Sequence, residues 1–306
     1  MRHGDVTFRR EGGHMVTSGV VRRTDVTAEV RGPDGNWLAT FTNDAYTVVL
    51  AGPRRRFAEG TASVSHARWV RTYPKPFTGR LHRPWLERAL AANQARVPDV
   101  LALAMQYIRG APALQEGGLQ VAGDARYGPG PETDRQEGSD FNDYLGVTWT
   151  YPDDPADPPE QDQFRCLDCS GYVRMVWGYR HHLPGAGFDD HVPLGLAPTR
   201  DRVSIPRRAH QIYDSAPGIL VVRRGEATDR LSRLEVGDLV FFDADTGDGR
   251  QIDHVGMYLG RDADRRYRFI SSRKRRNGPT LGDYHGASVL DGTGHYARSF
   301  CGVRRI

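Results

Sequence analysis

Two short runs of mostly apolar residues with a polar loop between them constrain the fold more than any other feature of the chain. The runs cover residues 234–242 and 252–260, and the loop covers residues 243–251. Each run starts at turn-forming residues and continues with β-branched or aromatic ones, the pattern of a strand. The sequence therefore predicts two sheet strands here, with His254 at the start of the second.

A cysteine lies at the start of a predicted buried helix. After Gly171, the apolar residues Val173, Val176 and Trp177 recur at helical spacing, which places Cys169 in or just before the first turn. Free N–H groups and the positive end of the helix dipole stabilise a thiolate there, so we expect a thiol pKa lowered toward neutrality. The alternative is a buried structural cysteine.

His254 is a candidate general base for Cys169. At the start of its strand, its ring could face the cysteine helix and accept the thiol proton. A hydrogen-bonded structural histidine is the alternative. The two motifs together favour a cysteine–histidine catalytic pair more strongly than either motif alone.

The N-terminal region has a different pattern. Residues 15–50 alternate apolar and polar side chains, with hairpin-forming residues at 32–36, which predicts a small β-rich module. Residues 71–79 contain prolines and read as a linker. Residues 84–109 have helical spacing, with a second helix starting at Pro98 and Asp99. We therefore expect a module and linker over residues 1–80 and a catalytic domain over residues 81–306.

Two long segments exceed what a minimal domain of this kind needs. They cover about residues 113–163 and 184–204, and the first is rich in Gly, Pro, Asp and Glu. We expect exposed insertions that reshape the substrate cleft. Three aromatic residues within 141–149 predict a loop that either faces the substrate or covers the core.

The charge of the chain favours anionic partners only weakly. Its 306 residues carry a net charge of +4, and the basic run 273–276 reads as a solvated turn that could contact an anionic substrate. No nucleic-acid-binding motif accompanies the charge, so we expect no nucleic-acid partner. With 38% hydrophobic residues, the chain can form one sizeable core and a small second domain or insertions.

The three cysteines do not form a disulfide framework, because they cannot all pair within the chain and at least one thiol is left over. Cys166 and Cys169 form a Cys-x-x-Cys pattern, but no second pair accompanies it. The nearest histidines, His181 and His182, lie across the helix, so we expect neither a zinc site nor a thioredoxin-like one. Cys166 is either a bystander, which we favour, or a partner of Cys169 in an inhibitory disulfide.

Three motifs together resemble the successive signatures of the NlpC/p60 superfamily of cell-wall cysteine peptidases. They are the segments 168–173, 237–242 and 254–260. Weaker similarities at 104–110 and 205–211 follow the same order, so the resemblance covers about residues 98–306. It implies an α+β protein whose papain-like core packs an antiparallel sheet against the cysteine-bearing helix, preceded here by the β-rich module.

The resemblance also implies a role for each matching residue. Cys169 would be the nucleophile and His254 the general base and acid, while Asp168 and Ser170 would help to bind a free amine of the substrate. The family has an upstream tyrosine that corresponds to Tyr127. In the family, a third polar residue, usually His, Asn or Gln, orients the base. The matching position here is Ser271, whose side chain is shorter and reaches less far toward His254. No metal or organic cofactor is expected.

The implied activity is hydrolysis of amide bonds in peptidoglycan stem peptides, of the γ-D-glutamyl-diamino acid type, through a thioester acyl-enzyme. An acyltransferase or amide-forming enzyme with the same Cys–His pair, or a catalytically silent wall-binding protein, remains open. The exact bond and the oligomeric state also remain open.

The compartment remains open as well. The sequence shows no apolar signal-peptide core near Met1 and no apolar run long enough to span a membrane. An enzyme acting on the wall would require a signal that has been removed, whereas a native start at Met1 would imply a cytoplasmic protein.

Overall fold

The computed structural model describes residues 21–23, 27–152, 155–181, 183, 192–226, 231–245, 247 and 249–306. The protein is a mixed helix and sheet protein with a β-rich N-terminal sheet, which confirms the expected class at this level. Some predictions lie outside the described residues: the strand pattern of residues 15–20, His182, and the first part of the insertion at 184–204.

Five antiparallel strands form the N-terminal sheet, and their spatial order follows the sequence. Between the second and third, the Gly32 N–H donates to the Asn36 carbonyl at 2.8 Å, so the predicted hairpin at 32–36 is confirmed. The strands are β1 (Val21–Arg23), β2 (Thr27–Arg31), β3 (Trp37–Thr42), β4 (Thr47–Glu59) and β5 (Ala62–Thr72).

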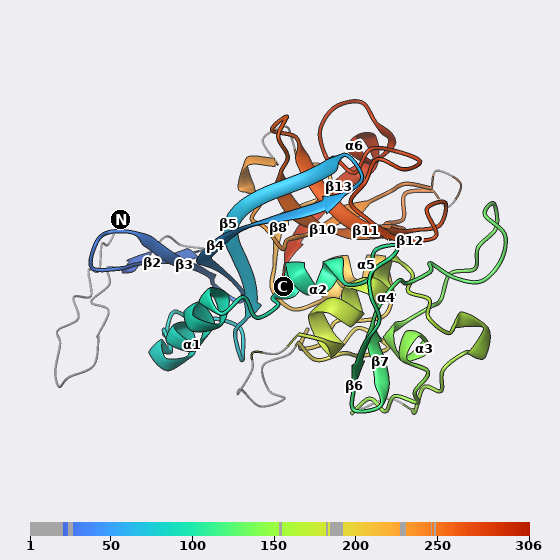
Figure 1. Cartoon of the computed structure of the whole chain (residues 1–306), viewed down its shortest axis with the longest axis horizontal. Coiled ribbons are helices and arrows are strands. Elements are labelled where there is room, and N and C mark those ends of the chain that lie inside the picture. The colour runs from blue at the N-terminus through green and yellow to red at the C-terminus, as the bar shows by residue number, and fades with distance from the viewer. Residues whose placement is uncertain are drawn as a thin grey trace.

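The long β4–β5 hairpin reaches from the N-terminal sheet across the C-terminal half of the protein (Figure 1). Phe57, Val64 and Val70 belong to the same hydrophobic cluster as Tyr172 of the cysteine-bearing helix. The Thr47 N–H also donates to the carbonyl of the last residue, Ile306, at 2.6 Å. The hairpin is thus part of the main core, and a domain boundary near residue 80 stays a prediction.

Two helices follow, α1 (Arg83–Gln94) and α2 (Val100–Met105). The predicted start of the second helix is confirmed, because the Asp99 side chain caps it by accepting from the Ala102 N–H at 3.0 Å. Arg55 of β4 pairs with the buried Asp99 carboxylate at 2.5 Å. The helix is shorter than predicted and ends before the turn at Gly110.

Six antiparallel strands form the C-terminal sheet, in the order β12-β11-β10-β9-β13-β8. Phe242 pairs directly with His254, so the two strands that the sequence predicts are neighbours in this sheet. The strands are β8 (Ile219–Val222), β9 (Leu239–Phe242), β10 (His254–Arg261), β11 (Tyr267–Arg273), β12 (Gly278–Thr280) and β13 (Phe300–Arg305).

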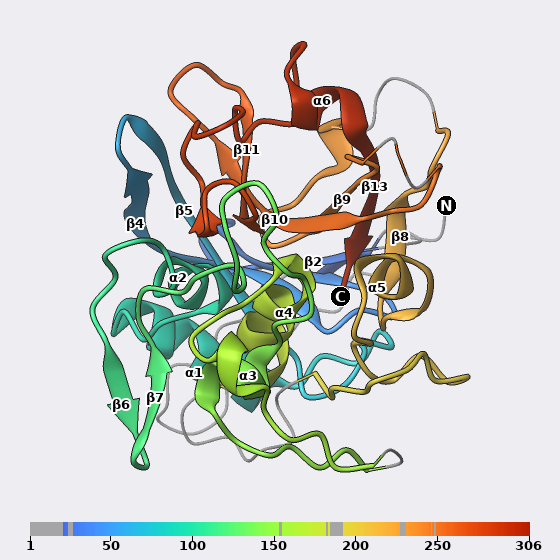
Figure 2. The ribbon, with the colours of Figure 1, turned by 90° about the vertical axis from the view of Figure 1, so that its right-hand side faces the viewer.

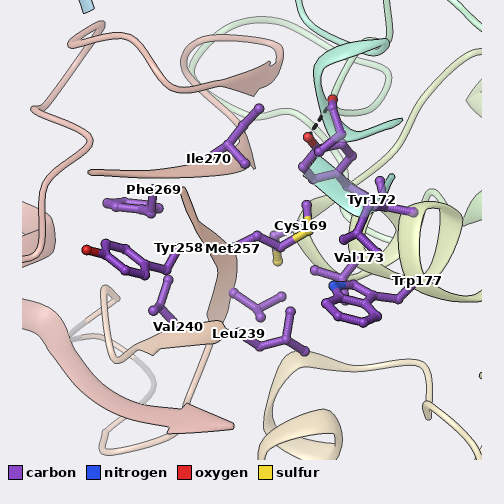
Figure 3. Close-up of a cluster of buried hydrophobic side chains, with 14 of the residues drawn as sticks. Cys169, Tyr172, Val173, Trp177, Leu239, Val240, Met257, Tyr258, Phe269 and Ile270 are labelled. Carbon is purple, nitrogen blue, oxygen red and sulfur yellow. Dashed lines mark hydrogen bonds between the residues drawn. The ribbon is translucent and has the colours of Figure 1, made fainter. Parts of the chain in front are cut away.

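The helix α4 (Cys169–Arg174) packs on one face of this sheet, and a π-helical turn, η2 (Met175–Tyr179), continues it. Figure 3 shows Cys169, Val173 and Trp177 directed toward Met257 and Leu239 of the sheet. The remaining helices lie around this core, with α6 on the side of the sheet opposite α4 (Figure 2). They are α3 (Phe141–Leu145), η1 (Gln161–Gln163), α5 (Ala209–Ser215), η4 (Leu231–Arg233) and α6 (His295–Ser299).

The first insertion is only partly exposed. Its hairpin of β6 (Leu114–Glu116) and β7 (Leu119–Ala122) is largely accessible, but Phe141 and Tyr144 of α3 are fully buried. The expectation of a wholly exposed segment is therefore wrong, and the core-covering alternative for residues 141–149 is correct. The buried Arg174 of α4 holds this segment through a 2.9 Å ion pair with Asp140.

Candidate active site

Cys169 is the first residue of α4, as predicted, and Asp168 is the cap of that helix. The Asp168 carboxylate accepts from the Gly171 N–H at 2.7 Å. Cys169 is 5% exposed and borders a cavity of about 340 Å³. The cavity is lined by Glu137, Gly138, Glu160, Asp168, Cys169, Ser170, Arg207, Arg208, Ala209, His210, Gln251, Ile252 and Asp253.

The sulfur of Cys169 contacts the backbone at the start of β10. Its thiol donates to the Asp253 carbonyl oxygen over 3.8 Å, and the Val255 N–H donates to the sulfur. The residue between these two contacts is His254. The structure therefore brings the two predicted catalytic residues to the same point in the fold, where a helix start meets a strand start.

The resting thiol does not have the lowered pKa that the helix position predicts. Burial raises the pKa of Cys169 well above its ordinary value, and the neighbouring Asp168 carboxylate raises it further. The Val255 N–H opposes both effects without overcoming them. The expected lowering toward neutrality is thus wrong for this state, because burial and the Asp168 carboxylate dominate.

The His254 ring is buried between aromatic side chains. Its centroid lies 5.6 Å from that of Phe242 and 5.6 Å from that of Tyr296 in α6. Burial lowers the pKa of His254 to about 3, and the charges of Arg273 and His295 lower it as well. The ring is therefore neutral at physiological pH, the state in which an imidazole can accept a proton.

One ring nitrogen of His254 has no orienting partner. Its Nε2 atom is buried and makes no hydrogen bond with any residue that the structure describes. Ser271 is also buried, on β11, and its hydroxyl accepts from Arg273 Nε at 3.1 Å. Arg273 in turn lies over the Tyr296 ring, 4.1 Å from its centroid. An orienting role for Ser271 stays a prediction.

Asp168 and Ser170 both contact Arg207, which the sequence did not assign to the site. Arg207 Nη2 donates to Asp168 Oδ2 at 2.8 Å, and its Nη1 donates to the Ser170 hydroxyl at 2.8 Å. Burial alone would raise the pKa of Asp168, but the ion pair with Arg207 and two backbone N–H groups hold it below its ordinary value. The proposed amine-binding carboxylate is thus already paired with a cation.

Tyr127 lies near the thiol. It is buried, its hydroxyl donates to Glu137 Oε1 at 3.3 Å, and its pKa is raised first by burial and then by the proximity of Cys169 and Asp168. The Glu137 carboxylate lines the cavity and also pairs with Lys274 at 2.7 Å. The tyrosine that the resemblance implies thus lies close to Cys169.

Three neighbours of the site were not assigned by the sequence: Arg207, Tyr296 and Glu137. Arg207 falls in the Pro-Arg segment that resembles the family, so a signal for it existed. Tyr296 and Glu137 carry no local signal, because each comes from a loop or short helix distant in sequence from Cys169.

Cys166 and Cys169 are buried free thiols, and Cys301 is buried as well. Within the described part of the chain, no group of three or more metal-binding side chains could hold a metal ion. No helix there is both long and apolar enough to cross a membrane.

Comparison with known proteins assigns part of the chain to a family. The family model described as NlpC/P60 family matches residues 159–274, a segment that contains Cys169, His254 and Ser271. A search of curated proteins gave no match.

Proposed function

Since the match over residues 159–274 makes the chain a member of the NlpC/p60 superfamily, a family of cell-wall peptidases and amidases, we propose that it is a cysteine hydrolase of peptide-like amide bonds. One observation carries the proposal. The thiol of Cys169, at the edge of an open cavity, contacts the backbone on both sides of His254. A papain-like core, as the resemblance implies, belongs to the same proposal.

In the proposed mechanism, Cys169 and His254 react from their neutral forms. His254 takes the thiol proton as the sulfur attacks the substrate carbonyl carbon, and the tetrahedral intermediate forms. His254 then gives the proton to the leaving amine, and the C–N bond breaks to leave a thioester. Water, deprotonated by His254, attacks the thioester and releases the acid and the thiol.

The oxyanion of the intermediate requires hydrogen-bond donors near the sulfur. The backbone N–H of Cys169 lies in the first turn of α4, where N–H groups lack partners within the helix. The Tyr127 hydroxyl, which lies near Cys169, is the second donor that we propose, and it would turn from its 3.3 Å hydrogen bond with Glu137 to the oxyanion.

The charged side chains that line the cavity favour a substrate that carries both positive and negative groups. Glu137 and Glu160 are exposed carboxylates that line it, and Arg207 and Arg208 line it as well. A stem peptide with a free amine and free carboxylates has this chemistry. We propose cleavage of a γ-D-glutamyl-diamino acid bond, with Asp168 and Ser170 at the amine site, where the Asp168 carboxylate also neutralises the charge of Arg207.

The proposal is tested by incubating the protein with purified muropeptides and identifying the products by mass spectrometry. The expected result is two fragments whose masses add up to the mass of the substrate plus one water. Cys169→Ala should give no product. Adding amine acceptors separates hydrolysis from acyl transfer, since a transferase would give an amide adduct in place of the free acid. An intact muropeptide pool after incubation with the wild-type protein would contradict the proposal.

The unpartnered Nε2 of His254 favours a second candidate, a catalytically silent wall-binding protein. If nothing orients the imidazole, the thiol is not activated. Iodoacetamide labelling distinguishes the two, because an activated Cys169 reacts faster at neutral pH than the buried Cys301. Equal labelling rates, together with retained binding to isolated cell walls, would favour the silent protein.

A further inference from the structure

A second cavity, of about 450 Å³, lies outside the proposed active site. Two stretches that are far apart in the sequence, 109–135 and 275–285, converge on it, and most of the charged side chains that they contribute are arginines. The arginines that line it are Arg109, Arg126, Arg135, Arg275 and Arg276. Two of these belong to the basic run that the sequence analysis singled out.

The positive charges of this cavity exceed the negative ones. The carboxylates that line it are Asp124 and Glu132, and Glu132 lies 3.7 Å from His285. Arg276 forms a 3.0 Å ion pair with Glu59, a residue that does not line the cavity. The other four arginines form no ion pair with any described residue, so they give the cavity a strong positive potential.

The hydrogen bonds of these four arginines leave donors available. Arg126 and Arg135 donate to backbone carbonyls, of Phe164 and Lys274 respectively. Arg109 and Arg275 are exposed and form no side-chain hydrogen bond with a described residue.

Two buried donors in the same cavity lack a partner. The Nε atoms of Arg135 and Arg276 make no hydrogen bond with any residue that the structure describes. Leaving a buried charged donor unpaired costs free energy. The guanidinium groups of these two lining residues are therefore not fully satisfied by the described residues.

We propose that this arginine-lined cavity binds a phosphate-bearing anion. A guanidinium presents two parallel N–H groups that match phosphate oxygens, and a phosphate group offers several acceptors and more than one negative charge in a small volume. A carboxylate would neutralise only one of the converging arginines. The inference is independent of the proposed hydrolase activity, since none of the lining side chains belongs to the cavity beside Cys169.

Titration calorimetry with inorganic pyrophosphate tests the proposal on the full chain. The expected result is saturable binding at one site that weakens as the salt concentration rises. Because each variant removes one charged donor, Arg109→Gln and Arg275→Gln should each weaken binding about tenfold. Both residues are exposed, so neither substitution disturbs the core. Arg88→Gln, at an exposed position on α1, is the matched control and should bind like the wild type.

A second arm identifies the source of the phosphate. A poly(glycerol phosphate) chain that binds more tightly than pyrophosphate, and loses affinity in the same two variants, indicates a phosphodiester polymer. Tighter binding of pyrophosphate indicates a small phosphorylated molecule. The proposal fails if neither probe binds saturably at millimolar concentration, if citrate binds as tightly as both, or if Arg88→Gln weakens binding as much as the cavity variants do.

Discussion

Arg207 forms a paired hydrogen bond with Asp168, the residue immediately before the proposed nucleophile. The two carboxylate oxygens of Asp168 accept from Arg207 at 2.8 and 3.3 Å, and the same carboxylate caps the helix that begins at Cys169. The Asp168 charge raises the pKa of the thiol, whereas the Arg207 charge lowers it. Arg207 therefore both stabilises the start of the helix and moderates the electrostatics of the sulfur.

Replacing Arg207 should destabilise the protein. Arg207→Gln leaves the buried Asp168 carboxylate without its cation, which should lower the free energy of unfolding by about 3 kcal/mol. Urea denaturation at pH 7 measures this loss. Arg208→Gln, at the exposed neighbouring position, is the control and should change the free energy by less than about 0.5 kcal/mol. Equal stabilities of the two variants would show that the ion pair does not hold the helix start.

Removing the two neighbouring thiols should have opposite consequences. We expect Cys169→Ala to abolish turnover while it leaves the fold intact, because it deletes the nucleophile and only a small buried group. We expect Cys166→Ala to keep most activity, because that thiol does not line the proposed active-site cavity and is bonded to the Phe164 carbonyl, at 3.8 Å, and to the Ser139 side chain. Hydrolysis rates and thermal unfolding of both variants check this. An active Cys169 variant with an inactive Cys166 variant would reverse the assignment.

The lowered pKa of His254 predicts an acid-tolerant enzyme. Protonated His254 cannot accept the thiol proton, so kcat/KM should fall only as the pH approaches the pKa of this ring. Since burial, Arg273 and His295 lower that pKa to about 3, the acid limb should lie well below the value of about 6.5 for an unperturbed imidazole. The pH profile of kcat/KM measures the limb. A limb near neutrality that disappears in His254→Ala would show that the ring is more accessible to protons than the structure indicates.

Ser271 should have a modest effect if it orients His254. Losing one neutral hydrogen bond would slow catalysis about 2- to 15-fold in Ser271→Ala. Ser271→Asn, with a longer acceptor, should restore kcat/KM in the protein that folds, although Ser271 is fully buried and its Cβ packs close to Gly256. The stability of each variant is measured in parallel, since Ser271 also accepts from Arg273. If kcat/KM of Ser271→Ala equals that of the wild type, another group orients the ring.

Gly171 should be irreplaceable for a steric reason. A Cβ at this position would lie 2.2 Å from the carbonyl oxygen of Ser139, so the helix and the preceding loop would have to separate. Gly171→Ala should lower the free energy of unfolding by at least about 2 kcal/mol, despite the better helix propensity of alanine. In the control Gly294→Ala, the new Cβ meets no atom within 4 Å, and the loss should not exceed about 1 kcal/mol. Comparable losses in both variants would argue against the steric cause.

The sequence by itself determined the local elements around the site. The start of α4 at Cys169 and the strands that contain Phe242 and His254 follow from short-range periodicity and turn chemistry, which depend on neighbouring residues. The family match covers the same segment. These features place the candidate nucleophile and base without reference to the rest of the chain.

Only the tertiary structure decided the chemical state of the site. The pairing of Arg207 with Asp168, the packing of Tyr296 on His254 and the burial that raises the pKa of Cys169 all join residues far apart in the sequence. Burial of the aromatic segment 141–149 and the reach of the β4–β5 hairpin also depend on long-range packing. The physical reason is that desolvation and ion pairing depend on which distant side chains exclude water from a group, and a local pattern carries no information about those neighbours.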